Sequence, residues 1–308
     1  MPKVGVTCSK YTNDVDALAC VVAYTELLNL EGVDATGYIM EEPNSSVTEE
    51  IKTWGYKYET KPTDTDISYV IADASYPESF PEFVKTENII EIYDHHSGFE
   101  KYWKEQIGDK SKIELIGACA TLIWEEYKKR GFKDKISQTS AKLIYAAIVS
   151  NTMNFKAKIT SPRDVLAFKE ISAIVELPKI WIEKYFMDQE DAVYKDPREA
   201  IINDIKIIEF PNIKMKITIG QMELWDAKKF VSDYKPLIKE VLNEFDHNQW
   251  FFNSPCISKG RNYIYSENEE IKRILEDLLE IKFKDGIAET KDLMLRKEIV
   301  KELQNLQM

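Results

Sequence analysis

Acidic and imidazole side chains follow three short apolar segments in the first third of the chain. These side chains belong to Asp14, Asp16, Asp73, Asp94, His95 and His96. If the three segments are parallel strands, their carboxyl ends meet at one edge of a sheet and the side chains converge there. Carboxylates that are crowded together repel each other, so a bound cation is the simplest way to hold them. Carboxylates combined with imidazoles suit Mn²⁺, Fe²⁺, Co²⁺ or Zn²⁺, and the pattern therefore predicts a divalent metal site.

Each member of this set also has an ordinary alternative. A single acid at a strand end is usually a helix cap or a turn residue, and Asp14 and Asp16 could cap the helix that follows them. The triplet at 94–96 is a short pattern on its own. The ordered combination of two acids one residue apart, a strand-end acid and then the triplet is much more specific. The third histidine, His247, has no acidic strand end beside it and is expected at the surface.

Composition indicates a soluble globular protein. The chain has 308 residues, of which 44% are hydrophobic and 31% charged, enough for one large domain or two ordinary ones. It contains no run of 18 apolar residues, and its first residues turn polar too early for a signal peptide. The four cysteines form no CxxC pair, so we expect reduced thiols in a cytoplasmic protein and neither a disulfide framework nor a zinc site.

The formal net charge of −12 bears on the ligand. A surface with this charge repels nucleic acid and other polyanions in bulk. We therefore expect no nucleic acid and no membrane among the partners. An anionic substrate would require a pocket that is locally positive.

Short apolar runs alternate with helical patterns through the first half of the chain. Expected strands are 3–8, 34–40, 67–74 and 88–96, and expected helices are 16–30, 45–55, 117–131 and 139–155. This alternation predicts an α/β fold with a largely parallel sheet that has helices on both of its faces.

A second, smaller α+β domain is expected after a polar segment with a proline. We predict a first domain over 1–193, a linker over 194–204 and a second domain over 205–308. Expected strands of the second domain are 205–210, 213–221, 249–258 and 261–266, and expected helices are 226–245 and 268–281.

The ordered motifs resemble those of the DHH phosphoesterase superfamily. Later features narrow the resemblance to the branch of the manganese-dependent (family II) inorganic pyrophosphatases and the related exopolyphosphatases, whose second domain is of the DHHA2 type. The similar stretches cover nearly the whole chain and are "TNDVDA" at 12–17, "DHHSGFE" at 94–100, "GACATLI" at 117–123, "AAIVSNTMNFKAKITSPRD" at 146–164 and "MLRKEIV" at 294–300. The last of these is the weakest.

The resemblance implies a role for each matched residue. Metal ligands would be Asp14, Asp16, Asp73 and His95, with position 151 as a further ligand. His96 would face the substrate, and Asp94 would orient a neighbouring histidine. In the second domain Arg296 and Lys297 would bind phosphate, because arginine forks over phosphate oxygens and lysine acts as a point charge. Lys214 would be a further substrate lysine, with Lys216 as a rival on the same strand face.

Two positions depart from the family pattern. Lys10 stands where the family has a histidine ligand, and Asn151 stands where it has an aspartate. Three carboxylates remain at −3, and Lys10 adds +1, so the sum is −2, which one divalent ion would neutralise. Lys10 could pair with Asp14 and Asp73 and stand in for the missing ion, or it could point to solvent while two ions bind.

Three functional hypotheses remain open at this stage. The chain could be a phosphohydrolase with an altered metal site that acts on pyrophosphate or short polyphosphate. It could be a degenerate relative that binds a phosphorylated ligand or partner without turnover. Asn151 could also have been introduced to trap a complex, although Lys10 would need a separate change. The surviving metal and phosphate residues favour the hydrolase.

The hydrolase hypothesis carries its own expectations about cofactor and partners. The cofactor would be one or two divalent ions, with Mn²⁺ expected first and Mg²⁺ or Co²⁺ as alternatives. The expected partners are a small phosphorylated substrate and a second copy of the chain in a homodimer.

Overall fold

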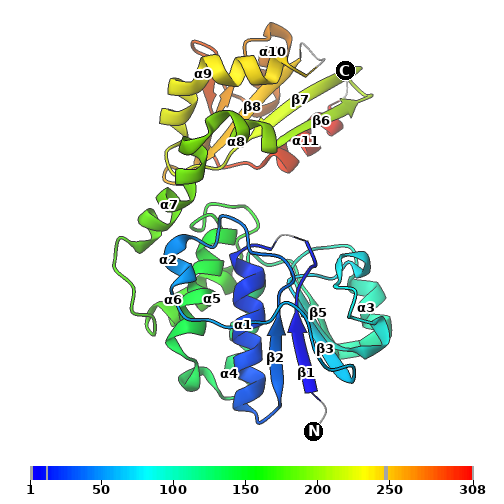
Figure 1. The fold of residues 1–308 in the computed structure, drawn as a ribbon. Coiled ribbons are helices and arrows are strands. Elements are labelled where there is room, and N and C mark those ends of the chain that lie inside the picture. The colour runs from blue at the N-terminus through cyan, green and yellow to red at the C-terminus, as the bar shows by residue number, and fades with distance from the viewer. Residues whose placement is uncertain (1–2, 12, 246–248, 307–308) are drawn as a thin grey trace. The chain divides into compact units, whose positions relative to one another are not determined.

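The computed structural model in Figure 1 describes residues 3–11, 13–245 and 249–306. The chain divides into two compact units, Met1–Trp181 and Ile182–Met308. Across the described residues, no helix combines the length and the apolar character that a membrane crossing requires.

The first unit is built on a five-stranded sheet in the order β2-β1-β3-β4-β5, and all four strand pairs are parallel. The strands are β1 (Lys3–Thr7), β2 (Ala35–Tyr38), β3 (Ile67–Ala72), β4 (Ile89–Asp94) and β5 (Ser111–Ile113). The predicted parallel α/β architecture is confirmed. Since β1, β3 and β4 are neighbours, their carboxyl ends lie next to one another, which is what the metal-site prediction required.

Helices cover this sheet. They are α1 (Val15–Leu30), α2 (Glu49–Lys52), α3 (Glu100–Ile107), α4 (Cys119–Lys129), α5 (Gln138–Asn151) and α6 (Pro162–Ser172). Trp103 of α3 packs with Ile67, Tyr69 and Ile71, which are alternate residues of β3 and therefore point to one face of the sheet. α1 is apolar nearly all round because it contacts the strands on one side and α4 and α5 on the other.

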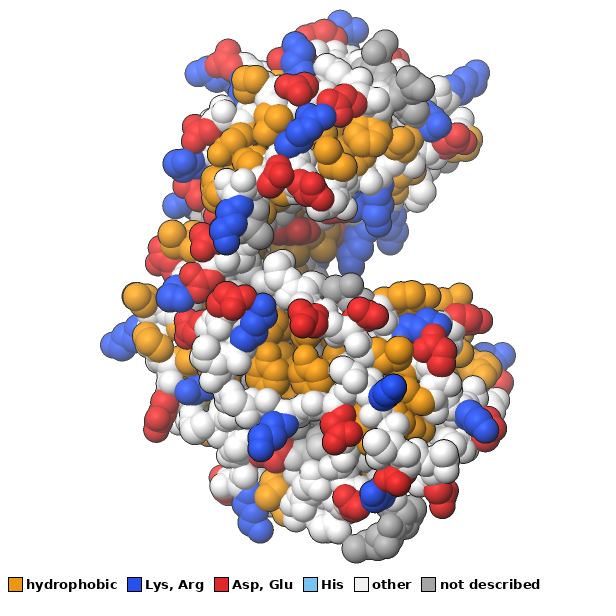
Figure 2. All heavy atoms as spheres, viewed as in Figure 1, with side chains coloured by type: hydrophobic (Ala, Val, Ile, Leu, Met, Phe, Trp, Pro, Cys, Tyr) orange, Lys and Arg blue, Asp and Glu red, His pale blue; other side chains and the backbone are white. Residues whose placement is uncertain are grey.

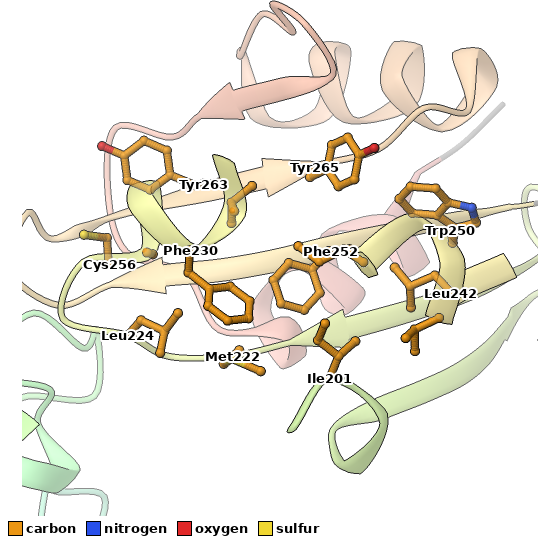
Figure 3. Close-up of a cluster of buried hydrophobic side chains, with 14 residues drawn as sticks. Ile201, Met222, Leu224, Phe230, Leu242, Trp250, Phe252, Cys256, Tyr263 and Tyr265 are labelled. Carbon is orange, nitrogen blue, oxygen red and sulfur yellow. The ribbon is translucent and has the colours of Figure 1, made fainter. Parts of the chain in front are cut away.

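The second unit has a mixed five-stranded sheet in the order β10-β9-β8-β7-β6, in which β7 and β8 pair in parallel. The strands are β6 (Ile205–Phe210), β7 (Met215–Gln221), β8 (Trp250–Cys256), β9 (Arg261–Tyr265) and β10 (Ile287–Glu289). Phe252 belongs to the apolar cluster in Figure 3, with Phe230 of α9 (Ala227–Asn243). The preceding residue, Phe251, belongs to a separate cluster with Ile271 of α10 (Glu269–Leu279). Successive strand residues point to opposite faces, so both faces of this sheet are covered.

Three further helices complete the second part of the chain. They are α7 (Trp181–Lys195), α8 (Pro197–Asn203) and α11 (Arg296–Asn305). The predicted linker, 194–204, consists largely of the end of α7 and the whole of α8. Asp196 caps α8 by accepting a hydrogen bond from the Glu199 amide, and Pro197 starts the helix without losing a hydrogen bond.

Candidate metal centre

Three side chains gather at the carboxyl edge of the parallel sheet. Asp73 follows β3 directly, and His95 and His96 follow β4. Each offers one potential ligand atom, and these atoms all lie within 4.8 Å of one another. The strand order therefore brings together residues that are more than twenty positions apart in the sequence.

Asp73 carries a carboxylate that the protein itself does not satisfy. Its backbone has φ of 58°, in the left-handed region that aspartate tolerates better than most residues. Its Oδ1 is buried and has no hydrogen-bond partner within the described part of the chain. Burial, followed by the charges of Asp16 and Asp14, raises the pKa of Asp73 well above its usual range. A cation at this oxygen would supply the missing partner and oppose the neighbouring charges.

His95 is held with one ring nitrogen facing this carboxylate. Its Nδ1 lies 3.1 Å from the carbonyl oxygen of Ile116, and because a carbonyl only accepts, Nδ1 is the donor of this hydrogen bond. Nε2 lies 3.4 Å from Oδ1 of Asp73 and 4.0 Å from Oδ2 of Asp16. This hydrogen bond and orientation are those of a metal-binding imidazole.

Asp94 holds the second histidine. Its Oδ1 accepts hydrogen bonds from the backbone amides of His95 and His96, at 2.8 and 3.2 Å, and lies 2.8 Å from Nδ1 of His96. Burial by itself would raise the pKa of Asp94, but the hydrogen bond and the charge of His96 outweigh it and lower that pKa. The His96 side chain is 64% exposed. Asp94 is thus placed to orient His96 and to leave Nε2 of that ring accessible.

Asp16 is fully buried and holds the start of α4. Its Oδ2 accepts from the Cys119 amide and its Oδ1 from the Ala120 amide, both at 2.8 Å. The residue before the helix, Ala118, has no side chain that could cap it. Burial raises the pKa of Asp16 in spite of these amides. Asp16 therefore combines a helix-capping contact with a place beside His95, and only the second was predicted.

Asn151 contacts Asp16 through its amide nitrogen. Nδ2 donates to Oδ2 of Asp16 at 2.6 Å, whereas the sequence suggested that Asn151 would offer an oxygen to a metal. An aspartate at this position would place a second negative charge against Asp16. The amide instead supplies a hydrogen bond and reduces the need for a cation there.

Asp14 and Lys10 both contact groups other than the Asp73 carboxylate. Asp14 is the N-cap of α1 and accepts from the amides of Asp16 and Ala17 at 2.8 and 3.1 Å, so its capping alternative is realised. The Lys10 ammonium lies 3.3 Å from Oε1 of Glu82. Among the described residues, this is the carboxylate it pairs with, and the suggested pairing with Asp14 and Asp73 is not what the structure has.

Asp164 supports the loop before α4, a role that the sequence analysis did not predict. Its carboxylate accepts from the Gly117 amide at 2.9 Å and from the Thr121 hydroxyl at 2.7 Å. A Cβ on Gly117 would lie 2.7 Å from Oδ2 of Asp164, so only glycine fits. Asp164 and Asp16 together hold the start of α4 beside the cluster of Asp73, His95 and His96. The clue in the sequence was the helix start without a capping side chain at 117–119.

The donor set fits a divalent ion. A carboxylate oxygen of Asp73 and a ring nitrogen from each of His95 and His96 are the oxygen and nitrogen ligands that Mn²⁺, Co²⁺ and related ions take.

The predicted phosphate residues of the second unit differ in exposure. Arg296 is the first residue of α11 and is buried; its guanidinium donates to the backbone oxygen of Asp204 at 2.7 Å and pairs with the carboxylate of the same residue. Its own backbone amide donates to Gln221 Oε1. Lys297, the next residue, is exposed. The pair thus offers one accessible cation and one that is already neutralised.

Lys214 does not lie on a strand, as the sequence suggested. It is in the turn between β6 and β7, with φ of 53°, and is exposed. Lys216 lies on β7 opposite Glu209 of β6. The prediction of a shared strand face for the two lysines is therefore wrong. The remaining histidine, His247, is outside the described residues.

The chain is similar in sequence to manganese-dependent inorganic pyrophosphatases. No protein-family model matches the chain. The manganese-dependent inorganic pyrophosphatase of Methanothrix thermoacetophila is 25% identical over 236 residues, which cover 75% of this chain and 72% of that protein. The Bacillus subtilis manganese-dependent inorganic pyrophosphatase is 22% identical over 240 residues, 75% of each chain.

A further relative is not named as a pyrophosphatase, and a solved structure superposes over nearly the whole chain. The A-adding tRNA nucleotidyltransferase of Aquifex aeolicus is 28% identical over 216 residues, but this chain spans only 23% of its length. A solved Methanococcus jannaschii protein, assigned to the family II inorganic pyrophosphatases, superposes with a TM-score of 0.59 at 21% identity over 98% of both chains, and so shares the fold. The resemblance to the manganese-dependent pyrophosphatases is confirmed.

Proposed function

We propose that this chain, which resembles manganese-dependent inorganic pyrophosphatases over three quarters of its length, is a metal-dependent phosphohydrolase for small phosphoanhydrides. The observation that carries the proposal is the buried, unpartnered carboxylate oxygen of Asp73 beside Nε2 of His95. A buried carboxylate in a protein is normally paired with a cation or hydrogen-bonded. The neighbour of this oxygen is Nε2 of His95, an atom that can itself bind a metal.

Asp73 and His95 would hold the ion, with His96 or Asp16 as the adjoining ligand. Mn²⁺ is the expected ion, and Mg²⁺ and Co²⁺ are alternatives. When bound, such an ion supplies Lewis-acid polarisation of phosphoryl oxygens and activation of water at neutral pH. The hydrogen bond between Asp94 and Nδ1 of His96 would aim Nε2 of that ring at the substrate, where it donates to a phosphoryl or leaving-group oxygen.

The second domain would supply cations for the far phosphate. Lys297 and Lys214 are exposed and suited to this role. Arg296 would either exchange Asp204 for a phosphate or brace the start of α11 beneath Lys297. The assignment of 1–193 as the catalytic domain, 194–204 as the linker and 205–308 as the substrate-binding domain is part of the same proposal.

A non-hydrolysing binder is the second candidate. The contact between Asn151 and Asp16 favours it, because a neutral amide now occupies a position that the resemblance gives to an acid. Such a protein would still bind a phosphorylated ligand through the same cluster but would not turn it over.

The test is phosphate release from pyrophosphate and tripolyphosphate with added Mn²⁺, Mg²⁺ or Co²⁺. We expect metal-dependent release that Asp73→Ala and His95→Ala abolish. Asp109→Ala is the matched control, since Asp109 is an exposed carboxylate that pairs with Lys104 outside the cluster. Silence with every metal, combined with retained binding of pyrophosphate, would replace the hydrolase by the binder.

A further inference from the structure

The exposed aromatic side chains of this protein are confined to one region. In the ranges 3–11, 13–245 and 249–306, three aromatic rings are exposed over more than a third of their surface: Tyr11 at 59%, Tyr76 at 50% and Tyr102 at 40%. Tyr11 follows β1, Tyr76 follows β3 and Tyr102 follows β4. All three therefore lie on the segments that leave the carboxyl ends of the strands that carry the candidate metal centre.

Two of these rings, Tyr76 and Tyr102, form a connected row with the ring of Phe99. The centroids of Tyr76 and Phe99 are 5.3 Å apart, and those of Phe99 and Tyr102 are 6.1 Å apart. Tyr76 is three residues beyond Asp73, and Phe99 is three residues beyond His96. The row, here called the aromatic rim and defined as Tyr76, Phe99 and Tyr102, thus starts on the same two loops as the metal-binding side chains.

Backbone hydrogen bonds connect the loop after β1 to the segment that carries Tyr76. The Lys10 amide donates to the carbonyl oxygen of Ser79 at 2.7 Å, and the Ser79 amide donates to that of Tyr76 at 2.9 Å. Tyr11 therefore belongs to the same loop cluster as the rim.

Packing of the hydrophobic core does not explain why the tyrosine rings are exposed. Trp103 and Phe80 lie beneath the rim, are fully or nearly buried and pack against the strands, whereas half of Tyr76 remains in solvent. Pyrophosphate and polyphosphate have no apolar surface that an aromatic ring could cover. A planar base does, because every nucleobase has a face that stacks on aromatic side chains.

We propose that the substrate of this site is a nucleoside polyphosphate, with its phosphates at the metal centre and its base stacked on the aromatic rim. The proposal rests on the proposed phosphohydrolase function and narrows its substrate class. A mononucleotide is favoured over a nucleic acid strand because the chain carries a net charge of −12, which opposes long polyanions more than a ligand with a few charges.

The reaction is a hydrolysis in which atoms balance without an oxidant or reductant. The water oxygen forms a bond to phosphorus, and the bond from that phosphorus to the bridging oxygen breaks. The bridging oxygen leaves with the electron pair on the nucleotide, and the protons of the water pass to the phosphate products and the solvent. The products are a nucleotide with a shorter phosphate chain and inorganic phosphate.

The test compares kcat/KM for ATP and ADP with that for tripolyphosphate and pyrophosphate, with Mn²⁺, in Tyr76→Leu and Tyr76→Phe. We expect the unmodified chain to prefer the nucleotides, and Tyr76→Leu to lower the nucleotide-to-inorganic ratio about tenfold, mainly through KM, since base stacking on one ring has roughly this effect. Tyr76→Phe should keep the ratio. Tyr56→Leu, which alters a tyrosine stacked on Tyr58 away from the rim, is the matched control.

Two outcomes would overturn the proposal. The first is no preference for nucleotides in the unmodified chain. The second is an equal loss on nucleotide and inorganic substrates in Tyr76→Leu, which would make the rim a packing or protein-contact surface. If no substrate is hydrolysed, the proposed function fails separately, and titration with ATP and Mn²⁺ still decides: binding that Tyr76→Leu weakens supports the rim, and no binding of ATP overturns it.

Discussion

Two groups of buried carboxylates in the first unit have opposite electrostatic surroundings. Glu91 of β4 and Glu126 of α4 are buried like Asp73, but protein cations reach them. Nζ of Lys110 lies 2.8 Å from Glu91, and Arg130 contacts both glutamates, with Nε 3.0 Å from Glu126. Burial alone would raise the pKa of each glutamate. The hydrogen bonds from Lys110 and Tyr24 and the charge of Arg130 outweigh it and lower the pKa of Glu91, while Lys112 and then Arg130 lower that of Glu126.

In the strand-end cluster, among the described residues, no lysine or arginine reaches Asp73, and the side chain that faces its carboxylate is His95. The pKa of Asp73 is raised by burial and by the other acids, and the nearby Lys10 pairs with Glu82. The Glu91–Arg130–Glu126 network is therefore complete in the protein alone, while the Asp73–His95 cluster would be completed by a cation from outside. We take this difference as the physical sign of a binding site. Figure 2 shows acidic and basic side chains interspersed over most of the visible face of each unit, apart from a group of basic side chains on the second unit.

The largest expected effect is loss of activity when the incomplete cluster is altered. Asp73→Ala should reduce Mn²⁺-dependent phosphate release by more than about 100-fold, since even groups that only support metal ligands have effects of up to roughly this size. Glu126→Gln, at a protein concentration corrected for folded fraction, should retain activity. Equal losses in the two variants would mean that the comparison between the groups is wrong.

The complete network should matter for stability instead. Arg130→Met removes the cation that Glu91 and Glu126 share but leaves Lys110 on Glu91 and Lys112 on Glu126, so we expect the free energy of unfolding to fall by about 1.5–3 kcal/mol, the range for hydrogen bonds to charged groups. Urea denaturation measures this change. Arg163→Met is the control, because Arg163 is 40% exposed and its pairs with Glu114 and Glu125 should contribute less than about 1 kcal/mol.

Removing the charge of Asp73 should have the opposite effect on stability. Asp73→Asn removes a buried negative charge that faces Asp16 and Asp14, so it should stabilise the metal-free protein at neutral pH by roughly 1–3 kcal/mol, since one unit of pKa shift corresponds to about 1.4 kcal/mol. Thermal unfolding in the presence of a chelator gives the value. The same variant should lose the stabilisation that Mn²⁺ confers on the unmodified chain. A metal-free variant that unfolds more easily than the unmodified protein would contradict this account of Asp73.

The two groups should also respond to pH with opposite sign. The folded-state pKa of Glu126 is lowered, so its contribution to stability is present above the unfolded value of about 4.3 and is lost as pH falls through the folded value. The folded-state pKa of Asp73 is raised, so the metal-free protein should lose stability as pH rises from about 3.9 through the folded value. Unfolding curves of Glu126→Gln and Asp73→Asn across pH 3.5 to 8, each compared with the unmodified chain, should show the two slopes.

The smallest expected effect concerns Asn151. In Asn151→Asp a second carboxylate would face Asp16, so we expect Mn²⁺ affinity to rise several-fold to about tenfold, corresponding to roughly 1 kcal/mol. Isothermal titration measures the change. No gain in affinity would place Asn151 outside the reach of the ion.

The sequence predicted the parts of the structure that local pattern determines. Apolar runs followed by acids predicted the parallel strands and the meeting of Asp73 with His95, because neighbouring parallel strands share an edge. Contacts between distant segments were not predictable in this way. The capping of α4 by Asp16 joins residues 103 positions apart, and the ion pair of Arg296 with Asp204 joins residues 92 positions apart.

One local prediction failed, and one of the two alternatives for Lys10 is not realised, for reasons of geometry. Lys214 lies in a turn because the chain reverses between β6 and β7 at 211–214, and its backbone is left-handed. Lys10 pairs with Glu82 because the hydrogen bond from its amide to Ser79 brings it beside that segment. Neither the turn at Lys214 nor the pair of Lys10 with Glu82 produces a hydrophobic periodicity from which it could be predicted.

Counting bound metal tests the central claim most directly. Titration of the metal-free chain with Mn²⁺, checked by elemental analysis after gel filtration, should give one tight ion per chain in the unmodified protein and none in His95→Ala or Asp73→Ala. Lys10→His combined with Asn151→Asp should raise the count to two. Two tight ions in the unmodified chain, or one tight ion that survives in both alanine variants, would contradict a single site built on Asp73 and His95.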